Sequence, residues 1–429
     1  MPNHADMHAA DADSESQGTM AEQLNRPLLG LNFFAGDVTA GFGPYLAIYL
    51  LSQLHWHPQN IGIALALGSI VTVAMQTPAG AIIDTIVAKR ALMIGCVSAV
   101  AVAALTIVFF DNTYAIFAAQ ATMGGALAFL GPLIAALTLG VVGHERFTRQ
   151  TGANQAWNHA GNVVAAAIAA ALALAFGFVD GVFYLIALMA LGMGVATLAI
   201  RPGAIDHGAA RGGVAQDATH HEKVSGVATV LGDRRLIIFA VSILLFHSAN
   251  AAMLPLVSQK VSTGAGTDTG IAFTSACIIA AQFVMIAMAI LCGRTADSWG
   301  RKPLFVLAFA ILPVRAVLYT LTDNAVLLVS IQALDGVANG IFAVLFLLIV
   351  SDVTKGTGRF NTAQGALAAL VGAGAALSNL AAEWIVQISS YDTAFLVLAA
   401  VAVVGVLFFT LLMPETAMHA RARRAAATA

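Results

Sequence analysis

Twelve apolar segments run through this chain, and each is long enough to cross a lipid bilayer as an α-helix. A helix rises about 1.5 Å per residue, so about 20 apolar residues span the roughly 30 Å of hydrocarbon. The chain is 59% hydrophobic and 10% charged, whereas soluble domains are roughly 45 to 50% apolar. We therefore predict an all-α polytopic membrane protein with spans at 28–51, 61–87, 91–110, 114–142, 152–178, 182–200, 236–257, 271–291, 304–321, 325–350, 360–388 and 395–413.

The basic residues are distributed unevenly over the connections between these spans. All but two of the 20 Lys and Arg residues fall in the terminal tails or in alternate connections, and the exceptions are Lys260 and Arg315. Because cytoplasmic loops collect Lys and Arg, we expect both termini in the cytoplasm and the spans in the bacterial inner membrane. The net charge of −2 provides no basic field for binding nucleic acid.

The spans fall into two sets of six that repeat each other. Asp84 and Asp297 lie 213 positions apart, and QATMGG at Gln120 recurs as QALDGV at Gln332 with an offset of 212. A duplicated six-span unit predicts a binding site between the halves, near the middle of the bilayer. The expected parts are an N-terminal tail (1–27), a first bundle (28–200), a linker (201–235), a second bundle (236–413) and a C-terminal tail (414–429).

A charged motif follows the second and eighth spans. Glycine lets two helices approach closely, the Asp can face a helix N-terminus or a basic partner, and a second glycine permits a tight turn. The complete copy consists of Gly293, Asp297, Gly300, Arg301 and Lys302. The other copy lacks the second glycine, carries its basic pair one position later, and consists of Gly80, Asp84, Lys89 and Arg90.

With its twelve spans, central linker and repeated motif, the chain resembles the major facilitator superfamily of transporters over residues 28–413. The resemblance implies that the motif holds a cytoplasmic gate closed. The basic residues expected beside Asp84 are Arg146 and Arg149, and those expected beside Asp297 are Lys355 and Arg359. If the gating charge is concentrated in the complete copy, Asp297→Asn impairs transport more than Asp84→Asn.

The chain departs from two patterns of the family that it resembles. Gln120 stands where many proton-driven members carry an arginine, so that proton-relay arginine is missing. Drug antiporters often carry a Gly-Pro pair in the fifth span, whereas Gly131 and Pro132 lie in the fourth. The resemblance therefore predicts the fold more specifically than the substrate.

Polar residues inside the spans are costly and usually face a cavity. Asp37 and Asp335 lie near mid-membrane, and we expect them to bind a proton or a cationic group of the substrate. Arg315 either pairs with Asp335, which would leave Asp37 as the coupling group, or extends toward the headgroups. The other candidates for substrate or proton binding are Gln120, Asn158, His159, Asn162, His247, Asn250, Gln332, Asn339 and Glu383. The polar face of the fifth span fits hydrogen bonding between helices equally well.

These features together predict a secondary active transporter that moves a small solute across the inner membrane by alternating access, coupled to protons. Motifs for ATP binding, metalloprotease or serine-hydrolase chemistry are missing, so we expect no enzyme activity, cofactor or metal. The expected partners of the monomer are a small-molecule substrate, the lipid bilayer and protons. Two alternatives stay open: a transport-inactive sensor or scaffold, and an exporter of drugs, metabolites or metal chelates instead of an importer.

Overall fold

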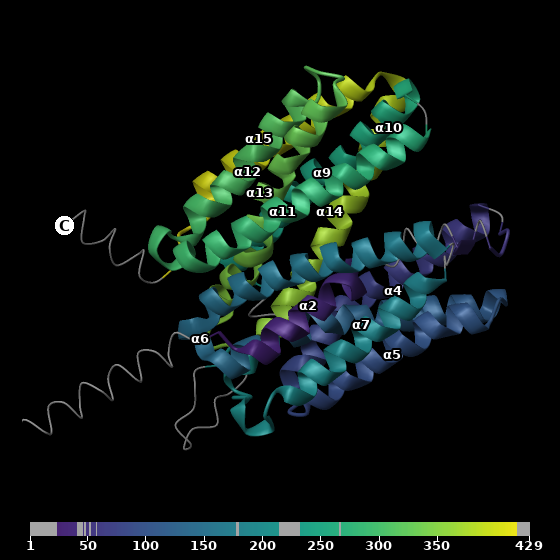
Figure 1. Cartoon of the computed structure of the whole chain (residues 1–429). Helices are drawn as coiled ribbons and strands as arrows, with labels where there is room; N and C mark the ends of the chain where they lie inside the picture. The colour runs from purple at the N-terminus through teal and green to yellow at the C-terminus, as the bar shows by residue number, and fades with distance from the viewer. Residues whose placement is uncertain are drawn as a thin grey trace, which may run out of the picture.

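The computed structural model folds into two bundles of helices (Figure 1). It describes residues 24–417 except 41–45, 47–48, 51–52, 57, 177–179, 214–231 and 266. The first bundle consists of α2 (Arg26–Ala40), α4 (Pro58–Thr85), α5 (Lys89–Phe109), α6 (Thr113–Phe176) and α7 (Gly181–Ala199). The second consists of α9 (Arg234–Asn250), α10 (Met253–Ala265), α11 (Thr267–Trp299), α12 (Arg301–Leu318), α13 (Ala325–Thr354), α14 (Phe360–Ile388) and α15 (Tyr391–Leu412).

Helices occupy the described parts of the predicted spans, with two differences in how the chain is divided. Part of the first predicted span, 28–51, lies outside the described residues. Over the described ranges, nine helices are long and apolar enough to cross a membrane. One of them, α6, covers the fourth and fifth predicted spans, and its helical backbone is interrupted at Gly143 (φ 69°, ψ 174°). The seventh predicted span is divided between α9 and α10. The all-helical class is confirmed, and the count of twelve spans stays a prediction.

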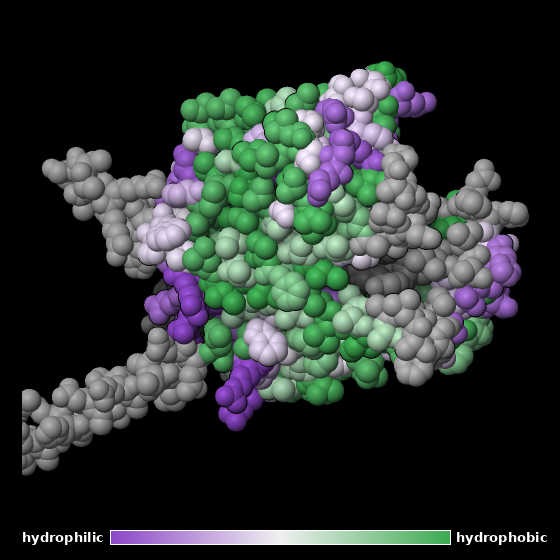
Figure 2. Space-filling view, turned by 45° about the horizontal axis from the view of Figure 1, so that its top comes forward, coloured by the Kyte–Doolittle hydropathy of each residue, from purple (hydrophilic) through white to green (hydrophobic). Residues whose placement is uncertain are grey.

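The outer surface of both bundles is apolar, as a surface that faces lipid requires. Figure 2 shows hydrophobic residues over the middle of the molecule and hydrophilic residues gathered toward its ends. Leu188, Leu380 and Leu411 are 63%, 73% and 77% exposed. Soluble monomers rarely expose continuous apolar surfaces of this kind, so this exterior belongs in a bilayer.

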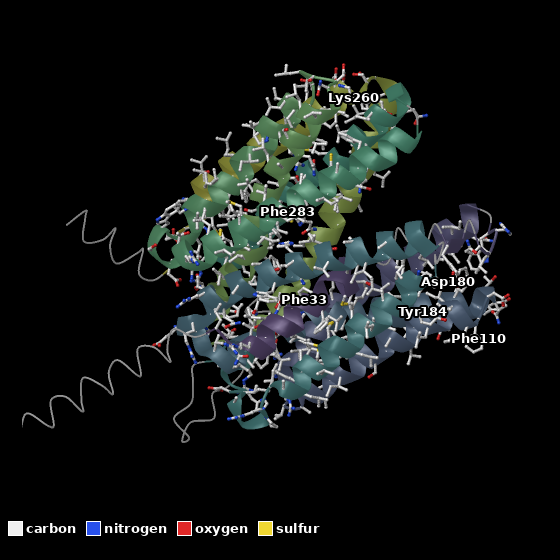
Figure 3. The ribbon with its side chains drawn as sticks, in the orientation of Figure 1. Phe33, Phe110, Asp180, Tyr184, Lys260 and Phe283 are labelled. Atoms are coloured by element: carbon white, nitrogen blue, oxygen red, sulfur yellow. The ribbon has the colours of Figure 1, made fainter. Side chains whose placement is uncertain are left out.

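The bundles meet at one end and diverge toward the other (Figure 1). We call the meeting end the linker end, because residues 201–213 begin the linker there with two 3-10 turns, η1 (Pro202–Ala204) and η2 (Ala209–Arg211). Asp206 N donates to Gly140 O of α6 at 2.8 Å, and Gly356 N donates to Gly212 O at 2.6 Å. The start of the linker is thus bonded to both bundles. Asp180 and Lys260 mark the opposite end (Figure 3).

Glycines set how closely α2 and α6 approach each other. A Cβ atom on Gly161 would lie 1.8 Å from Phe33 O, and one on Gly36 would lie 2.2 Å from Asn158 O. Neither contact can be relieved by rotating a side chain, because both involve backbone atoms. The close approach also positions the polar face of α6 against α2, where Asn158 Nδ2 donates to Asn32 O at 3.2 Å.

We expect Gly161→Ala to destabilise the first bundle, because the added methyl group forces α2 and α6 apart. Overpacking of this kind costs about 1 to 3 kcal/mol. The matched control is Gly95→Ala in α5, where a Cβ would meet nothing within 4 Å and alanine favours the helix by about 0.5 to 1 kcal/mol. Thermal unfolding of the purified variants in detergent measures both effects. Equal melting temperatures for the two variants would contradict the close-packing argument.

Candidate functional site

Asp84 fastens the first bundle to the N-terminus of α14 in the second. Its carboxylate accepts hydrogen bonds from Asn361 N at 3.1 Å, Asn361 Nδ2 at 2.9 Å, Thr362 N at 2.8 Å and Thr362 Oγ1 at 2.5 Å. The first backbone N–H groups of a helix have no partner within it, and its dipole favours a negative charge there. Asp84 is only 4% exposed. We call these three residues the first latch.

Asp297 makes the reciprocal contact from the second bundle. Thr148 Oγ1 of α6 donates to Asp297 Oδ1 at 2.8 Å, and Arg301 Nη1 donates to the same oxygen at 2.7 Å. The guanidinium also donates to Asp352 Oδ2 at 3.2 Å and to Thr148 Oγ1 at 3.2 Å. We call Asp297, Thr148 and Arg301 the second latch. Its carboxylate is 49% exposed, so this latch is wetter than the first.

The glycines of both motif copies allow the two bundles to touch. A Cβ on Gly80 would lie 2.0 Å from Asn361 O, and one on Gly293 would lie 2.9 Å from Gly152 Cα. Gly300, which precedes α12, has a φ of 97°, a value that favours glycine. The close approach and the tight turn predicted from the motif are confirmed.

The predicted basic partners of the two aspartates are wrong. The hydrogen bonds to Asp84 come from Asn361 and Thr362 instead of Arg146 and Arg149. Those to Asp297 come from Thr148 and Arg301 instead of Lys355 and Arg359. For Asp84 the physical reason is that a helix N-terminus supplies positive potential and free donors, so a buried carboxylate there needs no basic side chain. Asp297 does have a basic partner, but it is Arg301 of the same motif, four residues further along the chain.

The basic residues of the motif cap nearby helices. Lys89 is buried and its Nζ donates to Ile86 O at 2.6 Å, just beyond the end of α4. Arg90 donates to Thr197 O at 3.3 Å and to Leu198 O at 3.0 Å, at the C-terminal end of α7. These cations satisfy carbonyls that a helix leaves free at its end.

In the complete copy, the start of α12 is capped from the C-terminal segment. The N–H groups of Arg301 and Lys302 donate to the Glu415 carboxylate at 2.8 and 3.2 Å. A carboxylate placed at a helix N-terminus is favoured by the free N–H groups and by the helix dipole. Glu415 is 8% exposed, so the segment that follows α15 packs against the motif.

Arg315 and Asp335 form an ion pair inside the second bundle, as one of the two sequence interpretations predicted. Arg315 is fully buried in α12, and its guanidinium contacts Asp335 of α13. Its Nη2 also donates to Asn250 Oδ1 at 2.6 Å, where α9 ends. Asn339 Nδ2 donates to Asp335 at 2.8 Å, and Gln332 Nε2 donates to it at 3.2 Å. Five of the predicted site residues are thus assembled into one buried cluster, which we call the Arg315 cluster.

Polar residues of α6 face the second bundle and the space between the bundles. His159 Nδ1 lies 2.8 Å from Gln282 Oε1 of α11, across the interface. A cavity of about 320 Å³ lies between α2, α6, α13 and α14, and Asn154, Asn158 and Gln364 are among its lining residues. His247 packs against Phe342, another lining residue, with ring centroids 4.7 Å apart.

The remaining predicted residues lie away from this cavity or outside the described part of the chain. Gln120 is 3% exposed and packs against Gly68 of α4. Glu383 is exposed and accepts a hydrogen bond from Gln259 Nε2 at 2.6 Å. Asn162 lies on α6, where its backbone N faces Gly36. Asp37 lies on α2, but its side chain is outside the described part, so its role stays a prediction.

Comparison with known proteins identifies the family to which these two latched bundles belong. The model of the Major Facilitator Superfamily matches residues 28–285 and 264–428. The chain belongs to the major facilitator superfamily. It is 47% identical over 394 residues to an uncharacterised transporter of this type from Mycobacterium tuberculosis, covering 92% of this chain and 94% of the relative.

Solved structures of the superfamily share this fold at low sequence identity. The human organic anion transporter MFSD10 has a TM-score of 0.64 at 13% identity, covering 89% of this chain and 96% of its own. The proton:xylose symporter XylE has a TM-score of 0.65 at 14% identity, covering 91% of this chain and 95% of its own. One of these transporters is named for an organic anion and the other for a sugar. Membership of the superfamily makes the chain an integral membrane transporter of small molecules and not an enzyme. The fold shared with these structures leaves its substrate open.

Several contact residues were missing from the sequence predictions. Thr148, Asn361 and Thr362 belong to the latches, and none of them was singled out as a site residue. A signal for them exists in the repeat, since Thr148 and Asn361 are separated by the same 213 positions as Asp84 and Asp297. Two further cavity residues, Thr151 and Gln364, are also separated by 213 positions, so the repeat contains the same signal for them.

Proposed function

We propose that this superfamily member is a proton-coupled secondary transporter that moves a small solute by alternating access, as a monomer in the bacterial inner membrane. The linker end and both termini would face the cytoplasm, because Lys and Arg collect on that side of the sequence. The observation that carries the proposal is the pair of reciprocal latches between the bundles. Contacts made of hydrogen bonds contribute about 0.5 to 3 kcal/mol each, so they can be broken and remade during a transport cycle.

The pairing of Arg315 with Asp335 leaves Asp37 as the coupling group expected from the sequence, and the exposure of Asp335 makes this second carboxylate a further candidate for coupling to protons. Asp335 is 14% exposed and Arg315 is fully buried, so the carboxylate is the member of the pair that water can reach. Protonation of Asp335 would remove the charge that balances Arg315 and would weaken the link between α12, α13 and the break after Asn250. A buried charge without its partner is strongly unfavourable. Binding and release of a proton would therefore bias how the second bundle is packed.

Counterflow into proteoliposomes tests the proposal. Vesicles containing the purified protein are loaded with a panel of uncharged, cationic and anionic solutes, and uptake of the labelled solute is followed with and without a pH gradient. We expect counterflow for at least one solute without a gradient, and accumulation of that solute when a gradient is imposed. Counterflow that is unaffected by the gradient would contradict proton coupling. Absence of flux across the whole panel would favour the sensor or scaffold alternative.

A further inference from the structure

The cavity between the bundles is lined by uncharged side chains among the residues whose side chains the structure describes. It has a volume of about 320 Å³, near the lower limit of about 300 Å³ for small-molecule sites. Its walls come from α2 and α6 of the first bundle and from α13 and α14 of the second. None of the described residues that line it has an ionisable side chain. The ion pairs of the second latch and of the Arg315 cluster involve other residues.

Two residues that line this cavity each have a buried side-chain oxygen atom without a hydrogen-bond partner among the described residues. These atoms are Thr151 Oγ1 and Gln364 Oε1, on side chains that belong to residues 1% and 5% exposed. Both residues line the cavity, one from each bundle. An unsatisfied buried polar group costs about 1 to 3 kcal/mol. Such groups are found where a bound ligand or a water molecule supplies the missing hydrogen bond.

The rest of the cavity wall includes amide side chains from α6 and aromatic side chains from α13. Asn154 and Asn158 line the cavity from α6. The Asn154 amide is bonded to Gln150 and Thr138, and Asn158 Nδ2 donates to Asn32 O, while each amide nitrogen carries a second hydrogen and each amide oxygen can accept two hydrogen bonds. On α13, Phe342 and Phe346 line the opposite wall, with ring centroids 5.7 Å apart. A wall of this kind can bind hydroxyl groups along one side of a solute and its C–H surface along the other. A charged solute would be buried there without a counter-ion, at a cost of several kcal/mol.

We propose that the transported substrate is an uncharged, hydroxyl-rich solute, bound in this cavity by hydrogen bonds to Thr151 and Gln364. This inference rests on the proposed transport function and narrows its substrate class. Free sugars or polyols and nucleosides share this chemistry, and they can be tested separately. Both bundles line the cavity. Binding of a solute there would therefore depend on how the two bundles are positioned relative to each other.

Ligand-induced changes in melting temperature test the substrate class without any assay of flux. The purified protein is heated in detergent with D-glucose or myo-inositol, with adenosine or uridine, and with the charged analogues D-glucosamine and D-gluconate. We expect a concentration-dependent rise with one of the two uncharged pairs and none with the charged analogues, because a ligand that binds the folded state stabilises it. A rise with a charged analogue alone, or with none of the six solutes, would overturn the proposal.

The variants Thr151→Val and Gln364→Leu test the two oxygen atoms. Each substitution keeps the approximate size of the side chain and removes an unsatisfied acceptor, so we expect the empty protein to melt at a higher temperature. The apparent Kd of the uncharged solute should rise about tenfold. The control is Thr197→Val in α7, which is equally buried but donates from Oγ1 to Met193 O at 2.8 Å. This control should melt lower and bind the solute normally.

The outcomes separate this inference from the proposed function. Counterflow of a cationic or anionic solute, with a KM unchanged in Thr151→Val and Gln364→Leu, would retain the transporter and overturn the substrate class. Binding of an uncharged solute that depends on both residues, without counterflow of that solute, would retain the site and overturn transport. Lower melting temperatures for both variants would show that the two oxygens have structural partners and would overturn their assignment to the ligand.

Discussion

Asp84→Asn is expected to lower the transport rate more than Asp297→Asn, in the reverse order to the one favoured by the completeness of the motif. Asp84 is 4% exposed and all four of its hydrogen bonds cross between the bundles. An asparagine amide would direct an NH₂ group at the donors of Thr362. Hydrogen bonds to charged groups contribute about 1.5 to 3 kcal/mol, so the closed linker end would lose about tenfold to a hundredfold in population.

Thiol labelling measures this change directly. A cysteine introduced at Ala343, which lines the cavity, can be labelled with a membrane-impermeant maleimide added at the linker end. The native Cys96, Cys277 and Cys292 are buried, so their background reaction should be low. We expect Asp84→Asn to accelerate labelling and to slow counterflow. The control is Asp323→Asn, whose side chain is 84% exposed and pairs with Lys260 at the opposite end. Equal effects of Asp84→Asn and Asp297→Asn would mean that burial does not decide the strength of a latch.

Arg315→Met is expected to be the most destabilising single substitution in the second bundle. It would leave the Asp335 carboxylate without its buried counter-ion and would also remove the donor to Asn250 Oδ1. Breaking a buried ion pair by removing one partner costs about 3 to 5 kcal/mol. Melting temperature and the yield of folded protein measure the loss. Arg294→Met is the matched control, because Arg294 is exposed. Similar losses for the two variants would contradict a structural ion pair.

The double variant Arg315→Met with Asp335→Asn separates a structural role from proton coupling. It removes both charges together, so we expect most of the stability to return. If Asp335 carries the coupled proton, counterflow should persist while accumulation driven by the pH gradient is lost. If the pair is only structural, gradient-driven accumulation should persist as well, and retained transport in the swap of Arg315→Asp with Asp335→Arg would agree. Unreduced transport in both single variants would exclude any role for the pair.

The pairing of Arg315 with Asp335 could be predicted because the sequence offers few other charged partners inside the membrane. Arg315 lies within one apolar span and Asp335 within the next, and few other charges lie inside the membrane to balance either one. Gln332, Asp335 and Asn339 share a helix face by their spacing alone, and the structure places all three in the cluster. Periodicity is a property of the chain, so it survives folding unchanged.

The partners of Asp84 could not be predicted in the same way. They lie 277 and 278 positions away, at the start of α14 in the other bundle. Two of the four hydrogen bonds come from backbone N–H groups, which every helix start offers whatever its residue types. The sequence suggested basic side chains because their charge is visible in it, whereas the potential of a helix N-terminus appears only after the helices are placed.

The amino-acid sequence by itself determined the membrane-spanning helices, the internal repeat and the superfamily, because segment length, hydropathy and motif spacing are local properties of the chain. Only the tertiary structure decided which helix end faces Asp84. It also decided that the described residues of the cavity wall are uncharged and leave the oxygen atoms of Thr151 and Gln364 without partners among them. The physical reason is that hydrogen bonds act over about 3 Å. Which atoms come that close is fixed by the packing of one bundle against the other.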